Sequence, residues 1–170
     1  TVVDLDNATD ATDGGTTAVT LGATQADFDA SASQASVEVT GNALANTIAT
    51  GSGDDTITGG GGADAIDGGT GTDTAVYAAE LTTADVTADG EGHWQVNGGA
   101  EGTDTLTGVE VIDHGGEANI LLVGNGGFAT IQAAIDAAGN GDTIMIAAGT
   151  YAESLSIGKG ITLLGVGEVV

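Results

Sequence analysis

A nine-residue repeat constrains the fold of this chain more than any other feature of its sequence. Residues 41–76 divide into four nonamers, which read GNALANTIA, TGSGDDTIT, GGGGADAID and GGTGTDTAV. The eighth position of each nonamer is aliphatic, in the order Ile48, Ile57, Ile66 and Ala75. Because a unit this short cannot enclose its own apolar residue, successive units must stack into a solenoid.

In each nonamer the glycine-rich residues suit a turn, and the residues around the aliphatic position suit a short strand. Glycine in the turn adopts positive φ at little cost and lets main-chain carbonyls crowd a cation. A three-residue strand points one side chain inward and two outward, which matches one aliphatic residue per nonamer. The sixth position puts a polar side chain at the exit of each turn: Asn46, Asp55, Asp64 and Asp73. Since successive turns fall on alternate sides, Asp55 should stack on Asp73, and Asn46 on Asp64.

The residue types at these positions of the nonamer resemble the RTX (repeats in toxin) nonapeptide GGxGxDxUx. That family forms a calcium-binding parallel β-roll. The resemblance implies that Ca2+ lies between stacked turns and is held by side-chain carboxylates and turn carbonyls. The implied ligands are Asp55, Asp73, Asp64, Asn46, Gly51, Gly53, Gly60, Gly62, Gly69 and Gly71. Asp55 with Asp73 is the stronger implied site, because in the other pair Asn46 replaces Asp and Leu44 replaces Gly. We expect residues 41–76 to fold only when calcium binds.

The charge balance independently calls for a cation. The 170 residues include 25 Asp or Glu and 1 Lys or Arg, which gives a net charge of −24. A single basic residue cannot neutralise a nucleic-acid backbone or support a polybasic membrane contact. No apolar run approaches the roughly 20 residues of a membrane span. The absence of Cys excludes disulfides and thiolate zinc sites. Calcium, which takes several hard oxygen ligands, is the expected cofactor.

Several acidic residues lie outside the repeat positions. Spacing alone does not decide whether Asp104 joins a peripheral calcium site. The N-terminal acidic stretch lacks the glycine and terminal Glu of an EF-hand loop. The acidic residues that we expect to be solvated are Asp54, Asp67, Asp4, Asp6, Asp10 and Asp13.

Residues 77–123 are predicted to cap the open end of the repeats. Residues 72–112 resemble the segment that commonly follows RTX arrays, because they contain the phrases DTAVY and GTDTL…VE and a Trp-bearing strand. We expect Trp94 to lie in the core rather than form a carbohydrate platform. His93 and His114 are expected to be ordinary surface histidines. The predicted buried face is Val76, Tyr77, Val86, Trp94, Val96, Leu106, Val109 and Val111.

The stretch from residue 124 to residue 170 has a different pattern. Apolar residues at helical spacing predict a helix from Phe128 to Ala138. Strands are predicted at Thr143–Ala147, Ser154–Ile157 and Ile161–Leu164. The phrases FATIQAAIDAA, GDTIMIAAGTY and ESLSIGKGITLLG resemble the helix-capped opening of a pectin-lyase-like parallel β-helix. Lys159, between two glycines, is expected to be a solvated turn residue.

The predicted fold is all-β: a parallel β-roll or β-solenoid with a β capping segment and one short helix. We divide it into residues 1–40, 41–76, 77–123 and 124–170. The first part contains strand-like stretches at Ala18–Leu21 and Ser36–Thr40. It is either the end of a preceding domain or a set of early, irregular rungs of the same solenoid. The whole chain has the character of an internal or processed segment of a longer polypeptide.

The expected function is a calcium-binding structural segment of a large secreted or cell-surface bacterial protein. Such a protein would be an adhesin, a surface layer or an extracellular fibre, and the resemblance implies type I secretion with folding outside the cell. Expected partners are calcium, further copies of the chain and cell-surface polysaccharide. The alternative is an accessory segment of a polysaccharide lyase, esterase or epimerase whose active site lies outside this chain. No residue here is predicted to be catalytic.

Overall fold

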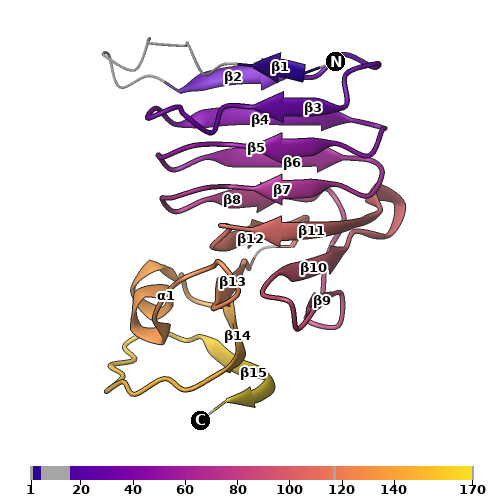
Figure 1. Ribbon diagram of the computed structural model, residues 1–170. Coiled ribbons are helices and arrows are strands. Elements are labelled where there is room, and N and C mark those ends of the chain that lie inside the picture. The colour runs from indigo at the N-terminus through magenta and orange to yellow at the C-terminus, as the bar shows by residue number, and fades with distance from the viewer. Residues whose placement is uncertain (1, 5–15, 117, 170) are drawn as a thin grey trace.

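The protein is a stack of short strands arranged in two facing sheets, as the computed structural model shows (Figure 1). The structure describes residues 2–4, 16–116 and 118–169. The chain passes from one sheet to the other at each turn, so consecutive strands of the repeats fall in different sheets. The prediction of an all-β parallel solenoid with one short helix is confirmed.

Each sheet combines a parallel ladder with a differently connected C-terminal end. The first sheet contains, in spatial order, β1 (Val2–Asp4), β3 (Asp27–Asp29), β5 (Thr47–Ala49), β7 (Ala65–Asp67), β11 (Thr103–Thr107), β10 (Trp94–Asn97) and β9 (Val86–Ala88). The second contains β15 (Thr162–Val169), β14 (Thr143–Gly149), β13 (Ile120–Val123), β12 (Val111–Asp113), β8 (Thr74–Val76), β6 (Thr56–Gly60), β4 (Val37–Asn42) and β2 (Thr17–Thr20).

The aliphatic residues of the nonamers form the core between the two sheets. Ile48 pairs with Ile66 across neighbouring strands of the first sheet, and Ile57 pairs with Ala75 in the second. All four are at most 3% exposed. The eighth-position prediction is therefore confirmed, and burying each Ile contributes about 1.5–3 kcal/mol relative to exposure.

Residues on the N-terminal side of the repeats continue the same two sheets. β2 pairs in parallel with β4, and β3 pairs in parallel with β5. Both strands predicted before residue 41 are present, as β2 and β4, and their pairing makes the described part of this segment continuous with the solenoid. The side chains of the predicted acidic loop, at Asp4, Asp6, Asp10 and Asp13, lie outside the described residues.

The segment after the repeats extends the first sheet at its end and adds antiparallel strands to it. β11 adds in parallel to β7, and β10 and β9 then follow in antiparallel order. Trp94 is fully buried, as predicted, and its indole N–H donates to the Gly124 carbonyl at 2.9 Å. Val76 and Val111 are only half-buried, which corrects the predicted buried face. The inward residue of β12 is Ile112, because the turn at 108–110 shifts the alternation by one residue.

The two histidines keep part of their surface exposed and also form hydrogen bonds within loops. Both are half-buried. His114 Nδ1 accepts hydrogen bonds from the backbone N–H groups of Leu81 at 3.3 Å and Gly116 at 3.2 Å. His93 Nδ1 lies 2.8 Å from Asp89 Oδ2 in the hairpin between β9 and β10.

Near the C-terminus, helix α1 (Ile131–Ala137) packs on β13 and β14 (Figure 1). Ile131 and Ile135 are buried against apolar residues of those strands. Thr130 caps the helix, since its side chain accepts the Ala133 N–H at 3.1 Å. The helix is shorter than predicted, because Phe128 lies before this cap. β14 and β15 confirm two of the three strands predicted here.

The predicted strand at Ser154–Ile157 is wrong, because residues 151–160 form a strap along α1 instead. Glu153 accepts the N–H groups of the first helical turn, at 2.9 Å from Ile131 and 2.9 Å from Gln132. Lys159 Nζ donates to three carbonyls at the other helix end, at 2.6–3.0 Å. Lys159 is exposed in a bend, as predicted, and it also caps the helix, where its charge complements the helix dipole. The described part of the chain contains no helix with the length and hydrophobicity of a membrane span.

Candidate metal centre

The polar residues at the turn exits form two columns, one along each long edge of the solenoid. The first acidic column consists of Asn46, Asp64 and Asp104. The second acidic column consists of Asp55, Asp73 and Glu110. Figure 1 shows the rungs that carry them, from β5 and β6 down to β11 and β12. All six side chains are buried, at 0–8% exposure. The columns arise because five of these residues immediately precede the strand of their rung and Asp104 is the second residue of β11.

In each column, a side chain binds the backbone of the rung above it. Asp64 Oδ1 accepts the Asn46 N–H at 2.7 Å, and Asp73 Oδ1 accepts the Asp55 N–H at 2.8 Å. The partners are 18 residues apart, which is two nonamers. The predicted stacking of Asp55 on Asp73 and of Asn46 on Asp64 is therefore what the structure contains.

The second oxygen of each repeat aspartate has no such partner. Within the described residues, Asp55 Oδ2, Asp64 Oδ2 and Asp73 Oδ2 are buried and accept no hydrogen bond. An ionised oxygen removed from water without a partner is costly, so these positions call for a cation. Asn46 differs, because its amide donates to Ala26 O at 3.0 Å and its Oδ1 accepts from Asn42 N at 3.0 Å.

Stacked turns bring main-chain oxygens close to these carboxylates. Gly62 lies directly on the turn above, since a Cβ at this position would stand 2.7 Å from both the carbonyl carbon and the oxygen of Leu44. A Cβ on Gly68 would collide with the Gly108 carbonyl oxygen and stand 2.9 Å from Asp73 Oδ2, so a main-chain oxygen and an unpartnered carboxylate oxygen both lie beside this glycine. Unpartnered carboxylate oxygens and backbone carbonyls thus share the interior of the turns. This donor set of hard oxygens fits Ca2+.

Burial also raises the pKa of four carboxyl groups in the columns, those of Asp64, Asp73, Asp104 and Glu110. The pKa of Asp73 is raised to about 7, first by burial and then by the charges of Asp55 and Glu110. Burial raises the pKa of Asp104 to about 6 and also raises those of Asp64 and Glu110. Each shift has the same origin, because the charged form has lost water without gaining a positive partner.

Metal-free protein should consequently gain stability on acidification. Between the unfolded aspartate pKa of about 3.9 and the folded value of about 7 at Asp73, the folded chain binds more protons than the unfolded chain. Folding free energy therefore becomes less favourable as pH rises through this window. In chelator, the far-UV circular dichroism β signal should be larger at about pH 5 than at about pH 8. In calcium the trend should reverse, because protons compete for the same oxygens. A β signal in chelator that is equal or larger at the higher pH would contradict this prediction.

The ten ligands implied by the sequence all lie in the four stacked turns of the repeats. Asn46, Gly60 and Gly62 fall on the edge of the first acidic column together with Asp64. The other edge carries Asp55, Asp73, Gly51, Gly53, Gly69 and Gly71. Asp54 and Asp67 are exposed and accept backbone N–H groups of Thr72 and Gly69.

Sequence reasoning missed Glu110 and left Asp104 undecided. A signal was present for Asp104, because Asp104, Thr105 and Leu106 repeat the acid–Thr–aliphatic order of Asp55, Thr56 and Ile57. Strand alternation through Val109 and Val111 would direct Glu110 outward. Its carboxylate instead lies 2.8 Å from the Asp73 N–H.

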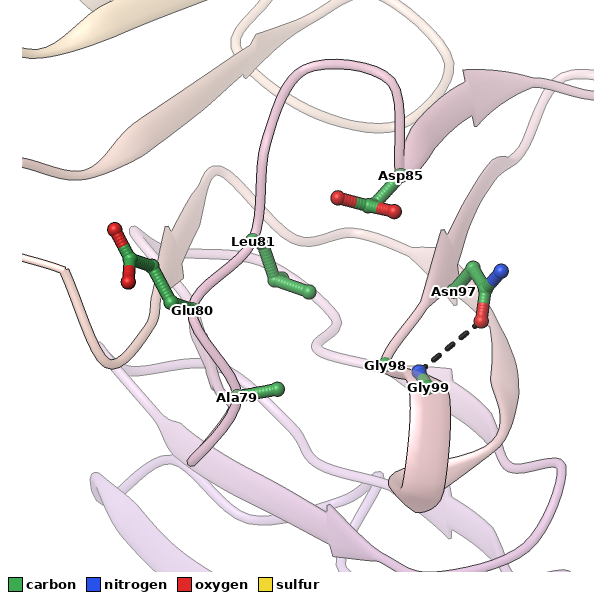
Figure 2. Close-up of a pocket in the computed structure, with 7 residues that line it drawn as sticks. All are labelled: Ala79, Glu80, Leu81, Asp85, Asn97, Gly98 and Gly99. Atoms are coloured by element: carbon green, nitrogen blue, oxygen red, sulfur yellow. Dashed lines mark hydrogen bonds between the residues drawn. The ribbon is translucent and has the colours of Figure 1, made fainter.

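Two other features of the described chain have simple structural explanations. Asp89, Glu91 and His93 bring three possible metal ligands within 4.8 Å in the β9–β10 hairpin. Asp89 Oδ1 accepts the Glu91 N–H at 2.7 Å, so the cluster is the hydrogen-bonded turn of that hairpin. Figure 2 shows a hollow with Ala79 and Leu81 directed into it. The Asn97 side chain in its wall accepts a hydrogen bond from the Gly99 N–H at 3.0 Å.

Comparison with known proteins identifies the repeats. A family model described as the RTX calcium-binding nonapeptide repeat, in four copies, matches residues 40–75. No curated protein and no solved structure matches the chain. The match covers the turns that hold Asn46, Asp55, Asp64 and Asp73. Residues 40–75 are therefore RTX calcium-binding nonapeptide repeats, and Ca2+ is the ion that this chain binds.

Proposed function

We propose that this chain is a calcium-stabilised structural segment of a secreted or cell-surface protein, and that it folds when it meets calcium after export. The observation that carries the proposal is the set of three buried, unpartnered carboxylate oxygens at Asp55, Asp64 and Asp73. Ca2+ supplies the positive charge and the several oxygen bonds needed to join one turn to the next. Low cytosolic calcium would keep the repeats unfolded until export, which fits the type I secretion typical of RTX repeats.

The proposed ligands are those implied by the sequence. Side-chain oxygens of Asp55, Asp73, Asp64 and Asn46 would bind the ions together with carbonyls of Gly51, Gly53, Gly60, Gly62, Gly69 and Gly71. The satisfied amide of Asn46 favours stronger binding between Asp55 and Asp73 than between Asn46 and Asp64. Residues 77–123 would cap this unit, since β11 and β12 continue its two ladders.

A calcium titration of the whole chain tests the folding proposal. In chelator near neutral pH, the far-UV circular dichroism spectrum should lack most of the β signal, because the aligned carboxylates repel one another. Addition of calcium to about the millimolar range should produce the β signal cooperatively. Magnesium serves as the ionic-strength control. An equal β signal in chelator and in calcium would refute calcium-dependent folding.

The role of the segment outside the cell would be scaffolding in an adhesin, surface layer or fibre, without catalysis. Sedimentation of the full-length protein, or of its assembled form, should separate this role from others. Chelator should dissolve or soften a calcium-built assembly, whereas an assembly indifferent to chelator would count against the proposal.

A second candidate is an accessory segment of a polysaccharide-modifying enzyme. The observation that favours it is the parallel run of β13, β14 and β15 with α1 packed on its face, as in the opening of a β-helix. Assay of the full-length gene product for lyase, esterase and epimerase activity on acidic polysaccharides distinguishes the two. Activity in that protein would favour the enzyme.

A further inference from the structure

We propose that the calcium sites extend beyond the nonapeptide repeats, and that Asp104 and Glu110 of the cap are the terminal calcium ligands of the two acidic columns. The inference rests on calcium binding by the repeats and adds two ligands outside residues 40–75. It makes the folding of the cap dependent on calcium as well. Four observations support it.

The first concerns Asp104, which continues the first acidic column without belonging to a nonamer. Asp104 Oδ1 accepts the Asp64 N–H at 2.8 Å, as Asp64 Oδ1 accepts the Asn46 N–H at 2.7 Å. The sequence separation is 40 residues instead of 18. Asp104 is 1% exposed, although it lies outside the family match. The cap therefore reproduces the local bond of the repeats after a long excursion of the chain.

The second observation is that Glu110 continues the second acidic column in the same manner. Glu110 Oε2 accepts the Asp73 N–H at 2.8 Å, and Glu110 is 8% exposed. Only residues 108–110 separate β11 from β12, whereas residues 68–73 separate β7 from β8. Glu carries one methylene more than Asp, which lets its carboxylate reach the column from this shorter turn.

The third observation concerns the oxygens that face the cap. Asp73 is 0% exposed, and its unpartnered Oδ2 lies beside Gly68. A Cβ at Gly68 would also collide with the Gly108 carbonyl oxygen of the cap. Within the repeats, Gly41 is placed in the same way against Asn46 Oδ1 and the Gly59 carbonyl. The cap thus offers a carbonyl and a carboxylate where a further repeat would offer them.

The fourth observation is the lack of a competing positive charge. Among the residues that the structure describes, the one Lys binds the carbonyls at the end of α1. The Tyr77 hydroxyl is buried beside the Asp104 carboxylate, but without the geometry of a full hydrogen bond. A role for Asp104 confined to Tyr77 is therefore the alternative that the experiment must separate from calcium binding.

The test uses the full chain and three charge-neutralising variants. Asp104→Asn, Glu110→Gln and their double variant keep a side-chain oxygen that can accept the backbone N–H. Asp113→Asn is the matched control, because Asp113 is exposed on β12 of the same rung. Native mass spectrometry counts the bound calcium ions. Fluorescence of Trp94, the one Trp of the chain, reports folding of the cap, and circular dichroism reports the repeats.

The double variant should bind fewer calcium ions than the wild type, and its Trp94 transition should need about ten- to hundredfold more calcium. The Asp113→Asn variant should match the wild type in both measurements. An ion count and a Trp94 midpoint unchanged in the double variant would overturn the inference, and would leave Asp104 as a partner of Tyr77 only. Failure of the wild type itself to bind calcium would instead overturn the function proposed above.

A crystal structure of the wild type grown in calcium keeps the inference testable if the double variant does not fold. Anomalous density for Ca2+ should appear next to Asp104 and Glu110 as well as between the repeats. Density confined to the repeats, with none beside either cap carboxylate, would overturn the inference.

Discussion

Replacement of Asp73 by Asn should abolish most calcium-induced folding at calcium concentrations that saturate the wild type. Asp73 stands at the centre of the second acidic column, between Asp55 and Glu110, and is fully buried. The amide oxygen of Asn can still accept the Asp55 N–H. The variant loses the anionic oxygen that has no protein partner, and an uncharged amide is a much weaker calcium ligand. The loss should raise the calcium midpoint at least about tenfold, or about 1.4 kcal/mol.

Asp67→Asn is the control for this prediction. It removes the same charge only six residues away, and Asp67 is exposed. Its Oδ1 accepts the Gly69 N–H at 3.1 Å, a bond that Asn can also make. Calcium midpoints come from circular dichroism titrations of both variants. Equal midpoints for the two would show that general charge, rather than a ligand at Asp73, controls folding.

The second large effect is expected at Gly62. Gly62 has φ +120°, and a Cβ there would lie 2.7–2.8 Å from backbone atoms of Leu44 and Ala45. Backbone atoms in a stacked turn cannot move aside as a flexible side chain can. Gly62→Ala should therefore combine a positive-φ cost of about 1–2 kcal/mol with an overpacking cost of about 1–3 kcal/mol. Urea unfolding in saturating calcium measures the sum.

Gly92→Ala separates these two costs. Gly92 has a similar φ of +103°, but a Cβ there meets nothing within 4 Å. This variant should lose only the positive-φ contribution, so Gly62→Ala should be less stable by about 1–3 kcal/mol. A smaller or reversed difference would mean that the stacked turns separate easily, and that close backbone contact is not what fixes their spacing.

Both predictions rest on features that were already visible in the nonamers. Ile57 and Ala75 could be assigned to the core because one inward residue per three-residue strand is a property of the strand itself. The pairing of Asp55 with Asp73 followed from the alternation of turns between two edges. The β-roll and its calcium binding were thus predictable wherever the period was intact.

Prediction failed where the period was lost. Simple alternation through Val109 and Val111 would direct Glu110 outward, but residues 108–110 form the turn between β11 and β12. Ser154–Ile157 has strand-like residues, but the flanking Glu153 and Lys159 bind the two ends of α1. Capping contacts of this kind depend on a helix more than twenty residues away, so no local sequence pattern predicts them.

The repeat, the inward aliphatic positions and the turn carboxylates follow from the order of residues alone, because contacts between nonamers recur at a fixed spacing of 18 residues. The residues that end the columns depend on how distant parts of the chain fold together. Asp104 and Glu110 reach Asp64 and Asp73 across 40 and 37 residues of chain. These sequence separations depend on how the β9–β10 hairpin folds back on the solenoid. They do not follow the regular spacing of the nonamers, so the spacing cannot predict them.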